Sequence, residues 1–211
     1  TILNVFSGFH QLDEGEIFFK GARINGLLPN EIFEKKIVRT FQIPKILKKM
    51  TKPKYLTMVE KNQLGERFWN TWLQRPSVRK QERSVKRKAL EVLQFVDLEH
   101  LKDEYADSLS GGQKKLLEFA RVIMCEPELV LLDEPGAGVN PTLMKKIGNS
   151  IEKLRREREI TFFIIEHDMD LVMKLCNPII VMAGGKKLTE GNATEIQQNK
   201  KVLETYLGGR K

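Results

Sequence analysis

The 211-residue chain is 41% hydrophobic and 30% charged, which fits one large globular domain or a domain with an added lobe. No apolar run approaches the roughly 20 residues that cross a bilayer, so we expect any membrane role to depend on a partner. The net charge of +8 could attract nucleic acid, an anionic membrane or an acidic partner, and the two cysteines, Cys125 and Cys176, indicate buried thiols rather than a disulfide framework.

The N-terminal part alternates short helical and strand patterns. The expected elements are helices over 1–9 and 29–36, a hairpin over 15–25, and a strand over 37–41. This strand ends at Gln42, which by itself reads as an ordinary polar surface residue.

Helical patterns replace strand patterns from about residue 44 to 106. One helical face carries Ala89, Val92, Leu93 and Val96, and aromatic residues cluster over 68–73. The segment 75–88 has seven basic residues and one acid, Glu82. It lacks interleaved aromatics, so a solvated helix face is favoured over a nucleic-acid site, and we expect no nucleic-acid partner.

The segment 109–134 joins a glycine turn to a pair of acids. Ser110, Gly111 and Gly112 precede a helix whose apolar residues recur at helical spacing. Exposed backbone N–H groups at such a turn suit an anion, although an ordinary serine cap is the alternative. The apolar run 129–132 predicts a buried parallel strand ending at Asp133-Glu134, where two carboxylates could hold Mg²⁺ and activate water, or could be solvated loop.

A second helix and strand follow. Asn140-Pro141 is a typical helix start, with Leu143, Ile147, Ile151 and Leu154 on one face. The strand 160–165 then ends in Glu166-His167-Asp168. A strand, crossover helix and strand should return His167 to the sheet edge of Asp133 and Glu134, although a lone histidine is more often structural.

Small elements complete the chain. The patterns predict a helix over 169–176, a hairpin of strands 178–183 and 186–189 around Gly184-Gly185, a helix over 194–198 capped by Thr194, and a helix over 201–207.

Three motifs in this order resemble the nucleotide-binding domain of ATP-binding-cassette (ABC) proteins: LSGGQ at 109–113, LDEP at 132–135 and EH at 166–167. The resemblance covers essentially the whole chain. It implies an α/β, P-loop NTPase-like fold with a mostly parallel sheet flanked by helices, N-terminal antiparallel strands and a helical lobe. The implied division is an ATPase core over 1–43 and 109–211, with the helical signalling lobe over 44–108.

The resemblance also implies site residues for ATP and Mg²⁺. Nucleotide would contact Ser110, Gly111, Gly112, Gln113 and Gln42. Mg²⁺ would be organised by Asp133 and Gln42. Glu134 would polarise the attacking water and His167 would contact the γ-phosphate. Ala137, Gly138, Val139 and Asn140 would form a loop at the interface of a head-to-tail dimer.

One family motif has no match in the 211 residues. The pattern of Asn4 to Gly8 is similar to the end of the helix that follows the phosphate loop GxxxxGK[ST], yet no such loop occurs in this sequence. That loop and its lysine cradle the β- and γ-phosphates. We therefore expect these 211 residues by themselves to bind ATP poorly and to be impaired in hydrolysis.

Further stretches resemble the ATPase subunits of branched-chain amino acid importers. They are GEIFFKG, TFQ, LDEPGAGVNP, IIEHDMDLVM and ETYLGG. This likeness implies ATP hydrolysis that powers import, a second ATPase subunit and integral membrane permease subunits as partners, and a cytoplasmic position at the inner face of the membrane. The alternatives are an ABC ATPase outside transport and a degenerate, non-catalytic cassette subunit.

Overall fold

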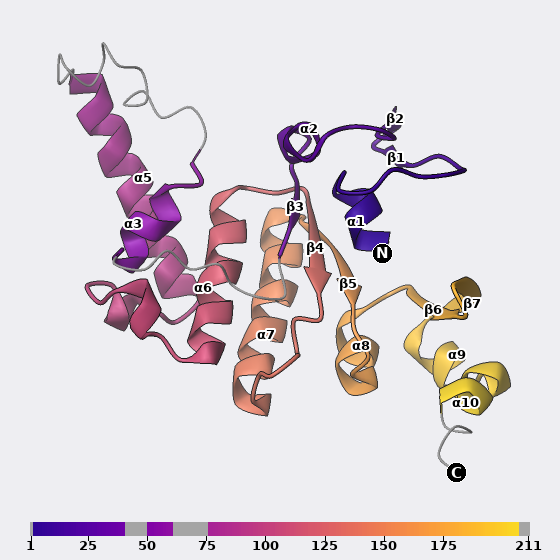
Figure 1. The fold of residues 1–211 in the computed structure, drawn as a ribbon. Coiled ribbons are helices and arrows are strands. Elements are labelled where there is room, and N and C mark those ends of the chain that lie inside the picture. The colour runs from indigo at the N-terminus through magenta and orange to yellow at the C-terminus, as the bar shows by residue number, and fades with distance from the viewer. Residues whose placement is uncertain (1, 41–49, 61–75, 207–211) are drawn as a thin grey trace. The chain divides into compact units, whose positions relative to one another are not determined.

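The computed structural model describes residues 2–40, 50–60 and 76–206. They form two compact units, Thr1–Phe163 and Ile164–Lys211, and each unit is described by itself. The three-part division expected from the sequence stays a prediction. Figure 1 shows the elements in chain order.

The first unit begins with short elements. Helix α1 (Ile2–Phe6) is shorter than the expected helix because Gly8 adopts a φ of +75° just after it. Strands β1 (Phe18–Phe19) and β2 (Ala22–Arg23) form the expected antiparallel hairpin, and α2 (Pro29–Glu34) follows. A Cβ added at Gly8 would lie 2.6 Å from the Leu27 carbonyl oxygen, so this turn requires glycine.

A parallel pair of strands carries the C-terminal strand ends on which the site depends. β3 (Ile37–Arg39) pairs with β4 (Leu129–Asp133) in parallel, and Arg39 lies opposite Leu131. The strand order is β3-β4-β5, with β5 at Thr161–Ile165 (Figure 1). In β4, Val130, Leu131 and Leu132 are at most 1% exposed, which confirms the buried strand.

Further helices among the described residues belong to the first unit. They are α3 (Lys52–Thr57), α5 (Pro76–Phe95), α6 (Gly111–Met124) and α7 (Pro141–Arg158), with 3₁₀ turns at Glu99–Leu101 and Ala106–Ser108. α3 packs on both α5 and α6. The apolar faces expected on α5 and α6 are buried, as are Ile147, Ile151 and Leu154 of α7.

α3 begins with a fully buried lysine. Lys52 Nζ donates to the carbonyl oxygens of Leu101 at 2.7 Å and Tyr105 at 3.4 Å. Burial lowers the pKa of Lys52, and Glu104 partly opposes this effect. The buried cation therefore ties α3 to the turns that precede α6.

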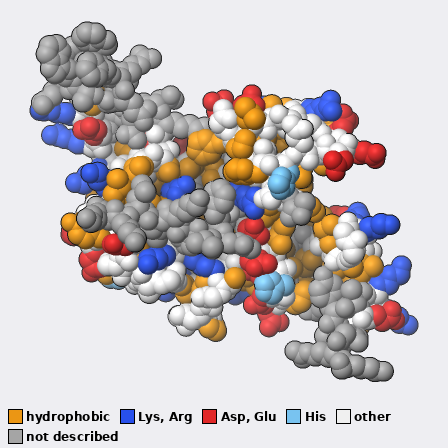
Figure 2. Space-filling view, viewed as in Figure 1, with side chains coloured by type: hydrophobic (Ala, Val, Ile, Leu, Met, Phe, Trp, Pro, Cys, Tyr) orange, Lys and Arg blue, Asp and Glu red, His pale blue; other side chains and the backbone are white. Residues whose placement is uncertain are grey.

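α5 carries the basic segment expected from the sequence. Its exposed basic residues are Arg79, Lys80, Arg83, Lys86 and Arg87. Figure 2 shows blue side chains at the left of the view, where α5 lies. The opposite face buries Val78, Ala89, Val92 and Leu93, so α5 is amphipathic as predicted.

The second unit is built on a hairpin. α8 (Met169–Leu175) precedes β6 (Ile179–Ala183) and β7 (Lys186–Gly191), which pair in antiparallel fashion around Gly184-Gly185. Helices α9 (Ala193–Gln198) and α10 (Lys200–Tyr206) follow. Its core consists of Ile179, Val181, Ile196 and Val202.

Two expectations were wrong in detail. Asn192, not Thr194, caps α9, because its side chain accepts from the Glu195 N–H while Glu195 accepts from the Asn192 N–H. The thiols of Cys125 and Cys176 are partly rather than fully buried, and burial raises the pKa of Cys176. None of the helices among the described residues is both long and apolar enough to cross a membrane.

Candidate functional site

The glycine turn forms the N-terminus of α6. Ser110 caps the helix: its Oγ accepts from the Gln113 N–H at 3.3 Å, while Gln113 Oε1 accepts from the Ser110 N–H at 3.0 Å. The serine-cap alternative is therefore observed. It does not exclude an anion site, because the capped helix end remains at the surface, with Ser110 and Gly111 exposed.

The two glycines of this turn have different surroundings. A Cβ at Gly112 would lie 2.2 Å from Leu143 Cδ2 in the first turn of α7. A Cβ at Gly111 would meet nothing within 4 Å. Gly112 thus permits close packing of α6 on α7, whereas Gly111 leaves open space in which another molecule can approach the backbone.

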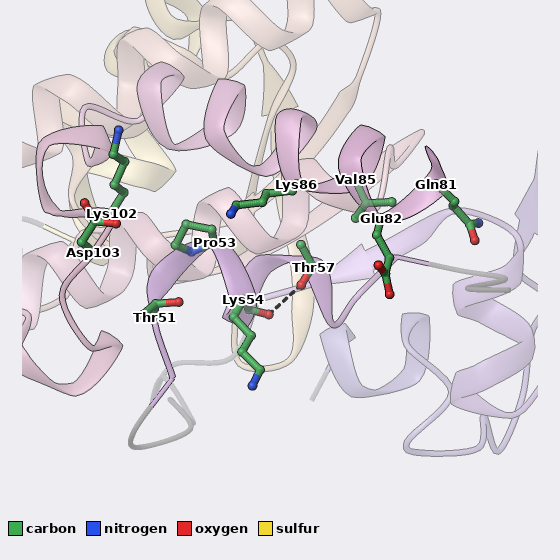
Figure 3. A pocket seen from close by; sticks show the side chains of 10 residues that line it. All are labelled: Thr51, Pro53, Lys54, Thr57, Gln81, Glu82, Val85, Lys86, Lys102 and Asp103. Carbon is green, nitrogen blue, oxygen red and sulfur yellow. Dashed lines mark hydrogen bonds between the residues drawn. The ribbon is translucent and has the colours of Figure 1, made fainter. Parts of the chain in front are cut away.

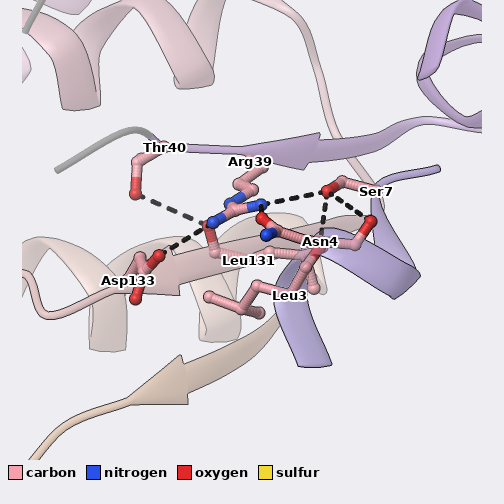
Figure 4. A network of polar contacts seen from close by, with 7 residues as sticks. All are labelled: Leu3, Asn4, Ser7, Arg39, Thr40, Leu131 and Asp133. Atoms are coloured by element: carbon pink, nitrogen blue, oxygen red, sulfur yellow. Dashed lines mark hydrogen bonds and ion pairs between the residues drawn. The ribbon is translucent and has the colours of Figure 1, made fainter. Parts of the chain in front are cut away.

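Asp133 ends β4 and is held by an arginine from the neighbouring strand. Arg39 NH2 lies 2.9 Å from Asp133 Oδ2, and the two side chains are 13% and 18% exposed. Arg39 NH1 donates to Asn4 Oδ1 at 2.5 Å and to Ser7 Oγ at 3.2 Å (Figure 4). One guanidinium therefore joins α1, β3 and β4 and fixes the orientation of the Asp133 carboxylate.

Asp133 suits a Mg²⁺ ion that is held mainly by nucleotide phosphates. Such ions need only one or two protein carboxylates. Arg39 contacts Oδ2, so Oδ1 is the oxygen that this ion pair leaves for a cation. Within residues 2–40, 50–60 and 76–206, no three His, Cys, Asp or Glu side chains gather closely enough to hold a metal ion by themselves.

Glu134 follows Asp133 in a strained conformation. Its φ is +47°, in the left-handed region that non-glycine residues adopt at a cost of about 1 kcal/mol. Its carbonyl oxygen accepts from the Ala137 N–H at 3.1 Å, which closes the turn after β4. Strain of this kind is common at functional sites, where neighbouring structure holds a side chain in one direction.

The turn from Glu134 to Asn140 connects β4 to α7. The Val139 N–H donates to the Gly136 oxygen at 3.1 Å, and Gly138 has a φ of +67°. Asn140 caps α7, because its Oδ1 accepts from the Leu143 N–H at 2.8 Å. Lys115 of α6 donates to the carbonyl oxygens of Ala137 and Pro135, the latter at 3.5 Å. Ala137, Gly138 and Asn140 are exposed, and Val139 is partly exposed.

Two further expected site residues, Gln42 and His167, lie apart from this set in the chain. Gln42 lies outside the described residues. His167 belongs to the second unit, where it is exposed and its N–H donates to Glu166 Oε2 at 3.1 Å. Asp168 then caps α8 by accepting from the Leu171 N–H at 3.2 Å.

Sequence reasoning missed Arg39 and Lys115. Arg39 lies 94 positions before Asp133, and only the register of β3 on β4 brings them together. The available signal was its position within the predicted strand 37–41, three residues before Gln42. Lys115 resembled any surface lysine of an amphipathic helix, and its carbonyl partners could not be anticipated.

A separate hollow of about 460 Å³ lies in the helical region between α3 and α5. Figure 3 shows Lys102 and Asp103 at one end and Gln81 and Glu82 at the other. Its lining mixes lysines and acids, and includes neither the residues of the α6 turn nor those that end β4. This hollow is therefore separate from the α6 turn and from the end of β4.

The comparisons with known proteins identify similar sequences and a family. The ABC transporter family matches residues 1–137. A protein of Archaeoglobus fulgidus named "Probable branched-chain amino acid transport ATP-binding protein LivG" is 42% identical over 214 residues, covering 100% of this chain and 80% of the relative. The high-affinity branched-chain amino acid transport ATP-binding protein BraF of Pseudomonas aeruginosa is 36% identical, covering 99% and 82%.

A solved structure gives the same result for the fold. An ATP-binding cassette of an ABC transporter superposes with a TM-score of 0.81 at 38% identity, covering 98% of this chain and 82% of that one. The expected α/β fold is thereby confirmed.

Proposed function

Because the chain belongs to the ABC transporter family, whose ATP-binding subunits are ATPases coupled to transport, we propose that residues Ser110 to Asn140 form two half-sites for ATP. In a head-to-tail dimer, Ser110 to Gln113 of one subunit would face the ATP held by the other. Asp133 and Glu134 would serve the ATP of their own subunit. The exposed, capped end of α6 and the open space above Gly111 support this assignment.

The proposed chemistry is attack of water on the γ-phosphate. Glu134 orients and polarises the water, and the N–H groups at the start of α6 stabilise phosphate charge. Asp133 would hold Mg²⁺, with Gln42 as a second ligand; Mg²⁺ would supply neutralisation of the phosphate charge. His167 contacts the γ-phosphate in this proposal.

One observation carries the proposal. Glu134 is held at a φ of +47° at the end of a buried strand, directly after the Arg39-oriented Asp133. Ligands of parallel sheets bind at such strand ends, so the two adjacent carboxylates lie where a Mg²⁺ ion and an attacking water would be needed.

The transported molecule and the partners are part of the proposal. The names of the relatives lead us to propose branched-chain amino acids as the substrate class and membrane permease subunits as partners. The ATPase would then work at the inner face of the membrane, with a second ATPase subunit. The transported amino acid would not contact this chain.

The test uses a loop-completed chain, in which a strand and GxxxxGK[ST] loop from a relative precede residues 1–211. We expect this chain to hydrolyse ATP with Mg²⁺ and the 211 residues alone to do so weakly. Glu134→Gln should lower the rate of ATP turnover by about 100-fold or more, while ATP still binds.

Glu159→Gln is a matched control, because Glu159 also has a left-handed backbone, with a φ of +54°, and is exposed. It should leave turnover unchanged. Normal turnover by Glu134→Gln would remove Glu134 from the proposed role. A loop-completed chain that binds ATP but never hydrolyses it would favour a non-catalytic cassette subunit.

A further inference from the structure

Helix α6 contacts both proposed half-sites. Its N-terminus carries Ser110 and Gly111, and Lys115, further along the same helix, reaches the turn after Glu134. The two half-sites serve different ATP molecules in the proposed dimer. Any rigid contact from α6 to that turn would therefore connect one ATP to the other.

We propose that Lys115 is a positioning residue that couples the signature turn Ser110–Gln113 to Glu134, and so links the two ATP sites of a dimer through each subunit. This inference rests on the proposed function above. Lys115 need not touch nucleotide for this role, because it acts through the backbone of the Glu134–Asn140 turn.

The contacts of Lys115 are suited to this task. Its ammonium donates to the carbonyl oxygens of Pro135 and Ala137, which stand on either side of Gly136. An ammonium has three donors and no acceptor, so one side chain can hold both carbonyls. The held turn contains Glu134, whose left-handed conformation persists only when surrounding contacts enforce it.

The packing of α6 on α7 makes the connection stiff. Gly112 allows Leu143 of α7 to approach the first turn of α6, and Asn140 fixes the start of α7. The Glu134–Asn140 turn is thus held at its end by the Asn140 cap of α7 and in its middle by the hydrogen bonds of Lys115. A shift of α6 at the signature turn would therefore move the turn at both points.

Lys114 provides a matched control. It is the adjacent lysine of the same helix, is also partly buried, and its N–H donates to the Ser110 oxygen as part of the helix. Lys114→Met removes the same charge and side-chain donors. It leaves the contacts of Lys115 to Pro135 and Ala137 in place.

The first experiment needs no nucleotide and uses the 211-residue chain. Amide hydrogen exchange over residues 134–140 should be about fivefold faster in Lys115→Met, because one or two hydrogen bonds to the turn are lost. Lys114→Met should leave it unchanged, and Lys115→Arg should restore most of the protection. Equal exchange in both methionine variants would overturn the proposal.

The second experiment measures ATP hydrolysis by the loop-completed chain at increasing ATP. Lys115→Met should lower kcat about tenfold and move the Hill coefficient toward 1, with ATP affinity unchanged. Lys114→Met should change neither. A parallel loss of ATP affinity, or an unchanged Hill coefficient, would contradict coupling through Lys115. Normal turnover by Glu134→Gln would instead refute the proposed function, while the exchange result would still report on the Lys115 contact.

Discussion

Two arginine–carboxylate networks in the first unit make an instructive comparison. In the first network, Arg39 forms an ion pair with Asp133 where strands β3 and β4 end. In the second, Arg121 NH1 lies 3.5 Å from Glu118 Oε1 within helix α6. The second network includes Tyr55 of α3, whose hydroxyl donates to Glu118 and accepts from Arg121 NH1 at 3.0 Å. Arg121 also lies over the Tyr55 ring, 5.8 Å from its centroid.

The difference lies in how each carboxylate is enclosed. Glu118 and Tyr55 are 8% and 2% exposed, and their network fastens α3 to α6. Asp133 lies at a strand end, where ligands of parallel sheets bind, and its side chain is 18% exposed. The Arg121–Glu118–Tyr55 network is suited to stability alone, and the Arg39–Asp133 network to stability and ligand binding.

The largest expected effect comes from breaking the strand-end network. Arg39→Met should lower the free energy of unfolding by about 3 kcal/mol, because it leaves Asp133 and Asn4 without their shared donor. Urea denaturation measures this. The double variant Arg39→Met with Asp133→Asn should recover about 1–2 kcal/mol relative to additivity. Strict additivity would mean that the pair is not coupled.

The helix network should produce a pH-dependent stability of about 2–3 kcal/mol. Burial, and then donation to Glu118, raise the pKa of Tyr55 from 10.0 to about 12. The folded state thus holds this proton more tightly than the unfolded state. Its stabilisation is complete below pH 10 and is lost as the pH rises through about 12. Unfolding by urea at pH 9 to 12 should show the loss, and Tyr55→Phe should lack this component.

A smaller effect is expected from Arg121→Met. Arg121 is 35% exposed at its side chain, so solvent weakens the pair and the loss should be about 1–2 kcal/mol. ATP binding by the loop-completed chain should stay unchanged. If binding fell more than in Asp133→Asn, the helix network would belong to the site, and the comparison would fail.

The smallest effects separate the two glycines of the signature turn. Gly112→Ala should cost about 1 kcal/mol because its Cβ would displace Leu143. Gly111→Ala meets no atom within 4 Å and should stabilise the chain by about 0.5 kcal/mol, yet should reduce ATP turnover. Thermal unfolding and hydrolysis assays distinguish the two. Full turnover in Gly111→Ala would argue against an approaching nucleotide.

Local sequence patterns predicted most helices and strands. The spacing of apolar residues indicated both the buried strand β4 and the buried faces of α5, α6 and α7. The Arg39–Asp133 pair could not be predicted, since it depends on strand register between distant segments. At α9, Asn192 and Thr194 are both competent caps, and reciprocal bonding with Glu195 selects Asn192. The expected roles of Ser110, Glu134 and His167 came from motif resemblance and stay predictions.

The left-handed backbone at Glu134 has a consequence for selection. Glycine at this position would relieve the strain and raise stability by about 1 kcal/mol, while removing the carboxylate. A chain selected only for persistence of its fold would be expected to drift toward glycine there. If active enzymes keep glutamate there, selection for catalysis must outweigh a loss of about 1 kcal/mol in folding stability.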